Sequence, residues 1–194
     1  GELAFTGYWR KAFENRPALG IGLQASEAVQ NLTGQTQVIL KNGARARLDL
    51  SVSNSDYGQG YAYALSYDLA VDRGDTYDSW TFVADYTSED YSSLGNASGQ
   101  NPISWIFTGA YSHRFSADWL ANATASYRMS RSTFMDDSYT LSATTTYRVT
   151  PAWGLQFGTE YTDYGNRFGT TRDGFGFTIA LIWSPRYDRR GEAR

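Results

Sequence analysis

Hydrophobic and polar residues alternate along most of the chain. In segment 103–115 the odd-numbered positions hold mainly aromatic or aliphatic residues, and the even-numbered positions hold mainly serine, threonine, alanine and arginine. Segment 119–130 repeats this alternation, with Trp119, Tyr127 and Met129 on the apolar side. Successive side chains of a strand point to opposite faces, so a period of two predicts strands whose faces meet different environments.

The same alternation extends over the rest of the sequence. It is strong in segments 44–52, 61–69, 139–149, 153–161 and 175–183, and weaker in 3–12, 18–27, 34–41 and 78–90. Together these segments predict about eleven strands, and ten or twelve fit the pattern equally well.

Tight turns alternate with longer polar loops between these strands. The tight turns lie at 42–43, 116–118 and 150–152, and the longer loops lie near 91–102, 132–137 and 166–173. Short turns on one rim and long loops on the other are typical of outer-membrane barrels. We therefore predict an all-β fold for residues 1–194, a single antiparallel up-and-down transmembrane β-barrel of about 10 to 12 strands or a segment of a larger one.

The main structural alternative is a soluble β-sandwich, which also alternates. Sandwich strands usually have about 5 to 6 residues, whereas these segments approach a dozen, so strand length favours the membrane. No apolar stretch reaches the roughly 20 residues that a spanning helix needs, so the strands are the expected membrane spans.

Composition agrees with strands and limits the chemistry. The chain has 15 Tyr, 10 Phe, 6 Trp and 19 Gly but only 4 Pro, a mixture that favours strands and turns. It has no Cys, which excludes disulfides and thiolate metal sites. A net charge of −3 without a basic block argues against a nucleic-acid partner.

Aromatic residues cluster near the expected strand ends. Indole and phenol rings prefer the headgroup level of a bilayer, so we predict an aromatic girdle with outer-membrane lipid as the partner. Its members at the short-turn rim are Trp9, Trp80, Trp119, Trp153 and Trp183, and toward the other rim they are Tyr61, Tyr91, Tyr139 and Tyr164.

Charged residues that alternate with apolar ones are expected to face a pore. An Arg that faced the bilayer midplane would cost about 2 to 4 kcal/mol, so these side chains should avoid lipid. The predicted lumen-facing residues are Arg45, Arg47, Asp49, Arg114, Arg128, Arg148 and Glu160. They would either guide cargo or form ion pairs that stiffen the barrel.

Nothing in the sequence indicates catalysis. The single His113 has no second His or Cys with which to share a metal ion, and no phosphate-binding loop or nucleophile motif is present. We expect no enzyme activity, no metal and no cofactor.

The last residues bear on whether the barrel closes within this chain. Trp183 is followed by Ser184 and Pro185, and segment 185–194 is charged, as in a turn or the start of a further strand. A bacterial single-chain barrel normally has an even number of strands and no free edge. We therefore expect a fragment of a larger barrel.

Three stretches resemble the barrel of the fimbrial ushers, the outer-membrane assembly platforms of chaperone–usher pili. They are Leu19–Ser26, Asp90–Gly95 and Trp183–Arg190, and the similarity spans most of the chain at low specificity. The resemblance implies a pore that receives chaperone–pilin complexes, catalyses donor-strand exchange without a nucleotide and exports the growing fibre. The plug and periplasmic domains of that family are not evident, which implies a barrel segment.

Other functions also fit this pattern. Tyr-Arg hairpin repeats occur in exopolysaccharide-export barrels, so a porin or exopolysaccharide-export barrel is the alternative to the usher. A small structural or adhesin barrel would require the 194 residues to close alone.

Overall fold

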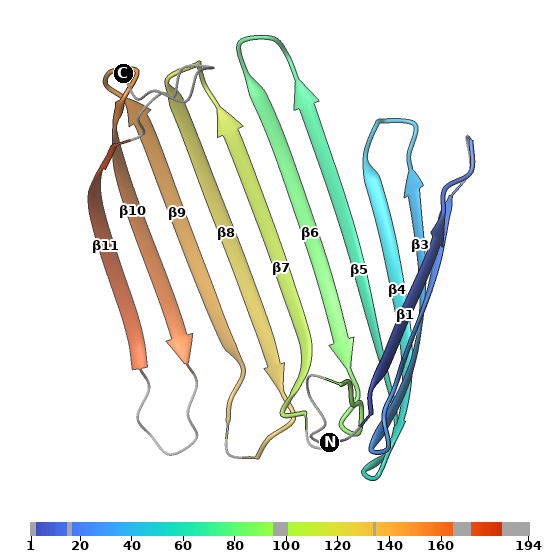
Figure 1. Ribbon diagram of the computed structural model, residues 1–194. Helices are drawn as coiled ribbons and strands as arrows, with labels where there is room; N and C mark the ends of the chain where they lie inside the picture. The colour runs from blue at the N-terminus through green and yellow to red at the C-terminus, as the bar shows by residue number, and fades with distance from the viewer. Residues whose placement is uncertain (1–2, 15–16, 95–100, 134, 165–171, 184–194) are drawn as a thin grey trace.

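Eleven antiparallel strands form one sheet in the part of the chain that the structure describes (Figure 1). The structure, a computed structural model, describes residues 3–14, 17–94, 101–133, 135–164 and 172–183. The strands are β1 (Phe5–Lys11), β2 (Ala18–Ala25), β3 (Val29–Ile39), β4 (Arg45–Ser55), β5 (Gly58–Asp72), β6 (Tyr77–Thr87), β7 (Ile103–Arg114), β8 (Trp119–Ser130), β9 (Ser138–Arg148), β10 (Trp153–Tyr164) and β11 (Arg172–Trp183). Each strand pairs with its neighbours in the sequence, which confirms the predicted all-β, up-and-down order.

The strand limits differ from the predicted ones mainly in β3 and β5. β3 begins at Val29, although the alternation predicted a start at residue 34, and β5 extends to Asp72 beyond the predicted segment 61–69. Both extensions consist of residues that pair in register with the neighbouring strand. Pairing with a neighbour therefore extends a strand where its own alternation is weak. Segment 185–194, predicted to be a turn or a further strand, lies outside the described residues.

The turn between β3 and β4 shows how the short connections form. Gly43 has a φ of 81°, a left-handed conformation that favours glycine, and its N–H donates to the Leu40 carbonyl at 2.9 Å. The Asn42 side-chain oxygen accepts from the Ala44 N–H at 3.1 Å. A short loop that ends in a left-handed glycine is a common hairpin connection.

The rim asymmetry that the sequence predicted holds for only part of the sheet. Residues 115–118 and 149–152 form short turns on the short-turn rim, and the β6–β7 and β8–β9 connections on the opposite rim are longer. However, residues 26–28 and 56–57, on that opposite rim, also make short connections. The long connections are therefore confined to the part of this rim that follows β6.

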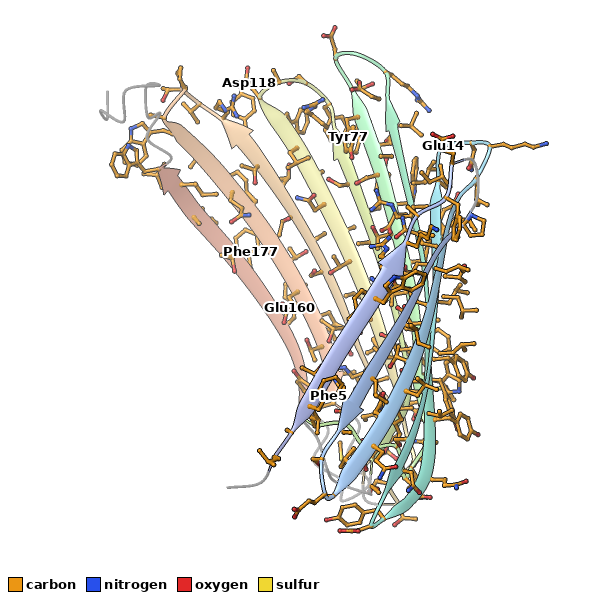
Figure 2. All side chains as sticks on the ribbon, turned by 45° about the vertical axis from the view of Figure 1, so that its right-hand side comes forward. Phe5, Glu14, Tyr77, Asp118, Glu160 and Phe177 are labelled. Atoms are coloured by element: carbon orange, nitrogen blue, oxygen red, sulfur yellow. The ribbon has the colours of Figure 1, made fainter. Side chains whose placement is uncertain are left out.

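The sheet is a single curved layer with two separate edges. Figure 2 shows it as an open trough, with Phe5 on β1 and Phe177 on β11 marking its two edge strands. Within the described residues β1 and β11 are not paired with each other. Val29 and Ala44 are the buried hydrophobic residues among those described, so no core lies between two layers. No helix in the described part of the chain is long and apolar enough to span a membrane.

Candidate functional site

One side of the sheet carries the large apolar side chains of every strand, and we call it the apolar face. The register keeps these residues together: Leu50 of β4 lies between Gly34 and Tyr63 of the neighbouring strands. One member from each strand in order is Trp9, Ile21, Leu32, Leu50, Tyr63, Phe82, Phe107, Tyr127, Leu141, Phe157 and Ile179. The apolar face is therefore continuous from one edge of the sheet to the other.

Protein atoms leave much of the apolar face uncovered. Leu50 and Phe82 are each 54 % exposed, and Ile179 is 61 % exposed. Soluble monomers rarely expose a contiguous apolar patch larger than roughly a few hundred Å², and this one extends across all the described strands. Such a face requires an apolar surrounding or a large partner.

The opposite side, which we call the polar face, is held together by hydrogen bonds between side chains of neighbouring strands. Thr33 and Ser51 hydroxyls lie 2.8 Å apart, and Gln35 donates to Asp49 at 2.8 Å. The same kind of pair recurs at Ser112–Asn122 and at Thr124–Ser142, both at 2.6 Å. Hydroxyl and amide side chains thus line this face over β3 and β4 and over β7 to β9.

Aromatic and amide side chains also bridge strands that are not adjacent on the polar face. Tyr8 of β1 reaches across β2 and donates to Gln35 of β3 at 3.0 Å. The intervening Gly20 makes this possible, because a Cβ there would lie 2.6 Å from the Tyr8 hydroxyl. A side chain that reaches over one strand to the next indicates that the polar face is the concave side here.

All seven predicted lumen-facing residues share the parity of the polar face. They are Arg45, Arg47 and Asp49 on β4, Arg114 on β7, Arg128 on β8, Arg148 on β9 and Glu160 on β10. This placement puts them opposite the apolar face. That the polar face borders a pore remains a prediction.

The structure does not bring these seven residues into one cluster. Arg47 and Asp49 form an ion pair at 2.8 Å, and Arg148 lies 3.9 Å from Asp118 of the β7–β8 turn. Arg114 lies over the Tyr77 ring, 5.6 Å from its centre. The contacts are local pairs spread over the face, as expected for ion pairs that stiffen the sheet.

The five predicted tryptophans lie on the apolar face. Trp153 and Trp183, paired in the register, have ring centres 6.3 Å apart, and Trp80 lies 5.0 Å from Tyr111. Trp119 donates its indole N–H to Thr145 at 2.7 Å. Near the short-turn rim, indole rings thus lie next to side chains that carry a hydroxyl group, Tyr111 and Thr145.

Two of the four predicted girdle tyrosines lie on the polar face and not on the apolar face. Tyr61 and Tyr139 are on the apolar face, where Tyr61 stacks on Tyr86 with ring centres 5.6 Å apart. Tyr91 accepts a hydrogen bond from Asn31 at 2.8 Å on the polar face, and Tyr164 has the parity of Glu160. The prediction was wrong for Tyr91 because its loop folds back over the sheet, and for Tyr164 because its alternation puts it on the polar side.

A buried carboxylate near the short-turn rim was not anticipated from the sequence. Asp78 is 4 % exposed and accepts from Tyr111 at 2.8 Å, and its Oδ1 lies 2.6 Å from His113 Nδ1. Arg73 of the neighbouring turn lies 3.8 Å from its other oxygen. In the described residues no group of three or more His, Cys, Asp and Glu could hold a metal ion. His113 is thus a partner of Asp78 on the apolar side of the sheet.

Comparison with known proteins gives one structural similarity. No family model matches the sequence, and no curated protein matches it. The structure is similar to one solved as "NanC porin structure in rhombohedral crystal form", with 10% sequence identity and a TM-score of 0.47. The similarity covers 93% of this chain and 92% of that chain.

Proposed function

We propose that this chain forms part of the wall of an outer-membrane β-barrel pore, with its apolar face against lipid and its polar face toward a water-filled lumen. The observation that carries the proposal is the continuous apolar face of a one-layer sheet that no described residue covers. Lipid would cover such a face, and only closed barrels and helices satisfy every backbone group in a bilayer. Most strands have 11 or 12 residues, enough to cross the bilayer at a tilt.

The direction of the edge strands supports a wide pore. Because the sheet has eleven antiparallel strands, β1 and β11 run in the same direction. Closing the sheet with antiparallel pairs alone requires an odd number of further strands. The closed barrel would therefore have twelve strands or more. A barrel of about eight strands is filled by its own side chains, and larger ones leave room inside.

The finer part of the proposal is export and assembly of pilus subunits, with this chain as a segment of a fimbrial usher barrel. The resemblance of Leu19–Ser26, Asp90–Gly95 and Trp183–Arg190 to ushers motivates it. The polar face supports it physically, because a wall of hydroxyls and locally paired charges offers few strong binding groups to a passing protein. Chaperone–pilin complexes would be the partners.

A second candidate is a porin or exopolysaccharide-export barrel, and one feature of the polar face favours it. A hollow of about 440 Å³ lies over β9 to β11. It is lined mainly by Ser142, Thr144, Gln156, Glu160 and Thr178, and Gly158 and Gly176 leave it open. These hydroxyl and amide groups match the hydrogen-bonding groups of a neutral sugar.

Deletion of the gene, with complementation by the wild type, separates these functions. The usher proposal expects loss of surface pili and of subunit secretion, with both restored by complementation. Intact pili with reduced uptake or release of small solutes or polysaccharide would instead support the second candidate.

Membrane fractionation tests the broader proposal of a pore. We expect the protein in the outer-membrane fraction, with a gel mobility that changes on boiling. A folded product in the soluble periplasmic fraction would overturn the membrane assignment and both candidates with it.

A further inference from the structure

The connection after β6 does not leave the sheet at the rim but turns back over the polar face. Residues Ser88–Ser92, which we call the strap, cross β5, β4 and β3. Ser92 is completely buried, and Ser88 is 9 % exposed. The burial of Ser88 and Ser92 therefore shows that the strap is packed against the sheet.

Hydrogen bonds attach the strap to β5, β4 and β3. Ser88 lies beside β5 and continues the β5–β6 pairing by one residue: its hydroxyl accepts from the Tyr61 N–H at 2.8 Å, and its N–H donates to the Tyr61 carbonyl at 2.8 Å. At β4 the Ser92 N–H donates to the Ser53 hydroxyl at 3.0 Å. At β3 the Asn31 amide donates to the Tyr91 hydroxyl at 2.8 Å and to the Ser92 carbonyl at 3.2 Å.

The backbone carbonyls of the strap are also bound. The Asn101 side-chain amide donates to the carbonyls of Ser88 and Glu89 at 3.0 Å each and to that of Tyr91 at 2.7 Å. Arg131 of the next loop donates to the Asn101 carbonyl at 3.2 Å. Asn101, at the other end of the same connection, thus holds the strap in place, and Arg131 of the β8–β9 connection holds Asn101.

Gly60 shows how closely the strap lies on the sheet. A Cβ at Gly60 would lie 2.2 Å from the Tyr91 Cα and 2.3 Å from the Tyr91 backbone nitrogen. No other residue type fits under this backbone. The sheet surface and the strap are therefore shaped to each other, which a loop in free solvent does not require.

We propose that the strap is a fixed constriction of the pore and sets the largest solute that passes at this rim. The proposal rests on the proposed function, because it needs the polar face to border a lumen. The bound backbone groups and the close contact at Gly60 make the strap a static part of the wall rather than a moving gate. It narrows the lumen on the side of β3 to β5 and leaves the polar face of β7 to β11 open to cargo.

Loosening the strap should widen the pore. The double variant Asn31→Ala with Ser53→Ala removes anchors at β3 and β4. As an independent second variant, Asn101→Ala removes the side-chain hydrogen bonds to the strap carbonyls. Asn122→Ala is the matched control, since Asn122 also lies on the polar face but pairs with Ser112, away from the strap. In planar bilayers we expect higher single-channel conductance for both strap variants of the pore that carries this chain, and wild-type conductance for the control.

An engineered disulfide tests whether the strap stays in place. The Ser55 and Ser92 hydroxyls lie 3.2 Å apart, so Ser55→Cys with Ser92→Cys should crosslink in a chain that otherwise has no cysteine. Thr124→Cys with Ser142→Cys, whose hydroxyls lie 2.6 Å apart, is the control crosslink away from the strap. We expect the strap disulfide to form and conductance to be the same before and after reduction.

The outcomes separate the constriction from the pore itself. Wild-type conductance in both strap variants overturns the constriction, and so does a rise in conductance on reduction of the strap disulfide, which would reveal a gate. Failure of that disulfide to form, while the control pair crosslinks, also overturns it. If the wild type conducts no ions at all, the proposed function fails and the constriction with it, even if the strap disulfide forms.

Discussion

The membrane assignment makes a prediction whose magnitude differs between lipid and water. Leu65 lies at the centre of β5, on the apolar face, beside Leu48 and Ala84 of the neighbouring strands. It is 51 % exposed, so a new side chain at this position would contact the surrounding medium more than other protein atoms. We therefore choose Leu65→Arg as the perturbation.

The adjacent residue provides a matched control on the other face. Ala64 lies on the polar face between Asp49 of β4 and Asp85 of β6. An Arg introduced there would have two carboxylates in reach and water around it. Ala64→Arg therefore adds the same charge one residue away, without contact with lipid.

The expected magnitude follows from the depth of Leu65 in the sheet. An Arg that faces lipid near the bilayer midplane costs about 2 to 4 kcal/mol, which lowers the folding equilibrium constant roughly 30- to 700-fold. In water, a substitution at an exposed surface position usually changes stability by less than about 0.5 kcal/mol. Lipid thus predicts a large loss for Leu65→Arg and little change for Ala64→Arg.

Denaturant unfolding in phospholipid vesicles, followed by tryptophan fluorescence, measures both variants. We use a barrel in which the sheet is closed, because β1 and β11 are not paired with each other within the described residues. If Leu65→Arg is as stable as Ala64→Arg, lipid does not cover the apolar face and the reasoning from that face to a membrane pore is refuted.

Two further predictions concern contacts within the sheet. Gly60→Ala should lower stability by about 1 to 3 kcal/mol, because its methyl group would overlap the Tyr91 backbone. Gly34→Ala is the control and should leave stability unchanged, because no atom lies within 4 Å of the new Cβ. Equal unfolding midpoints for the two variants would contradict the close contact at Gly60. Asp78→Ala should lower the thermal midpoint, because the buried carboxylate accepts from two side chains, whereas Asp75→Ala in the exposed turn should leave it unchanged. A midpoint unchanged in both would show that the Asp78 contacts do not stabilise the fold.

Alternation along single strands allowed much of the fold to be predicted. A period of two is a property of residues i and i+2, so the sequence alone separates the two faces of a strand such as β7 or β8. Antiparallel pairing through short turns then joins like faces, which is why Arg45 and Glu160 share the polar face although five strands lie between theirs along the chain. The same local pattern put Trp119 on the apolar side.

Contacts between distant segments could not be read from that pattern. Tyr91 looked like a rim residue because loops usually leave the sheet, but its hydroxyl bonds to Asn31, 60 residues earlier in the chain. The pair of Asp78 and His113 likewise joins two strands separated by a long connection, and only their register makes them neighbours.

The sequence by itself determined the strands and their two faces, because each depends on a few consecutive residues and on the pleat of the backbone. Only the tertiary structure decided the path of the strap, the position of Tyr91 and the separation of β1 from β11. These features depend on the curvature of the whole sheet and on hydrogen bonds between residues far apart in the chain. Local alternation carries no information about either.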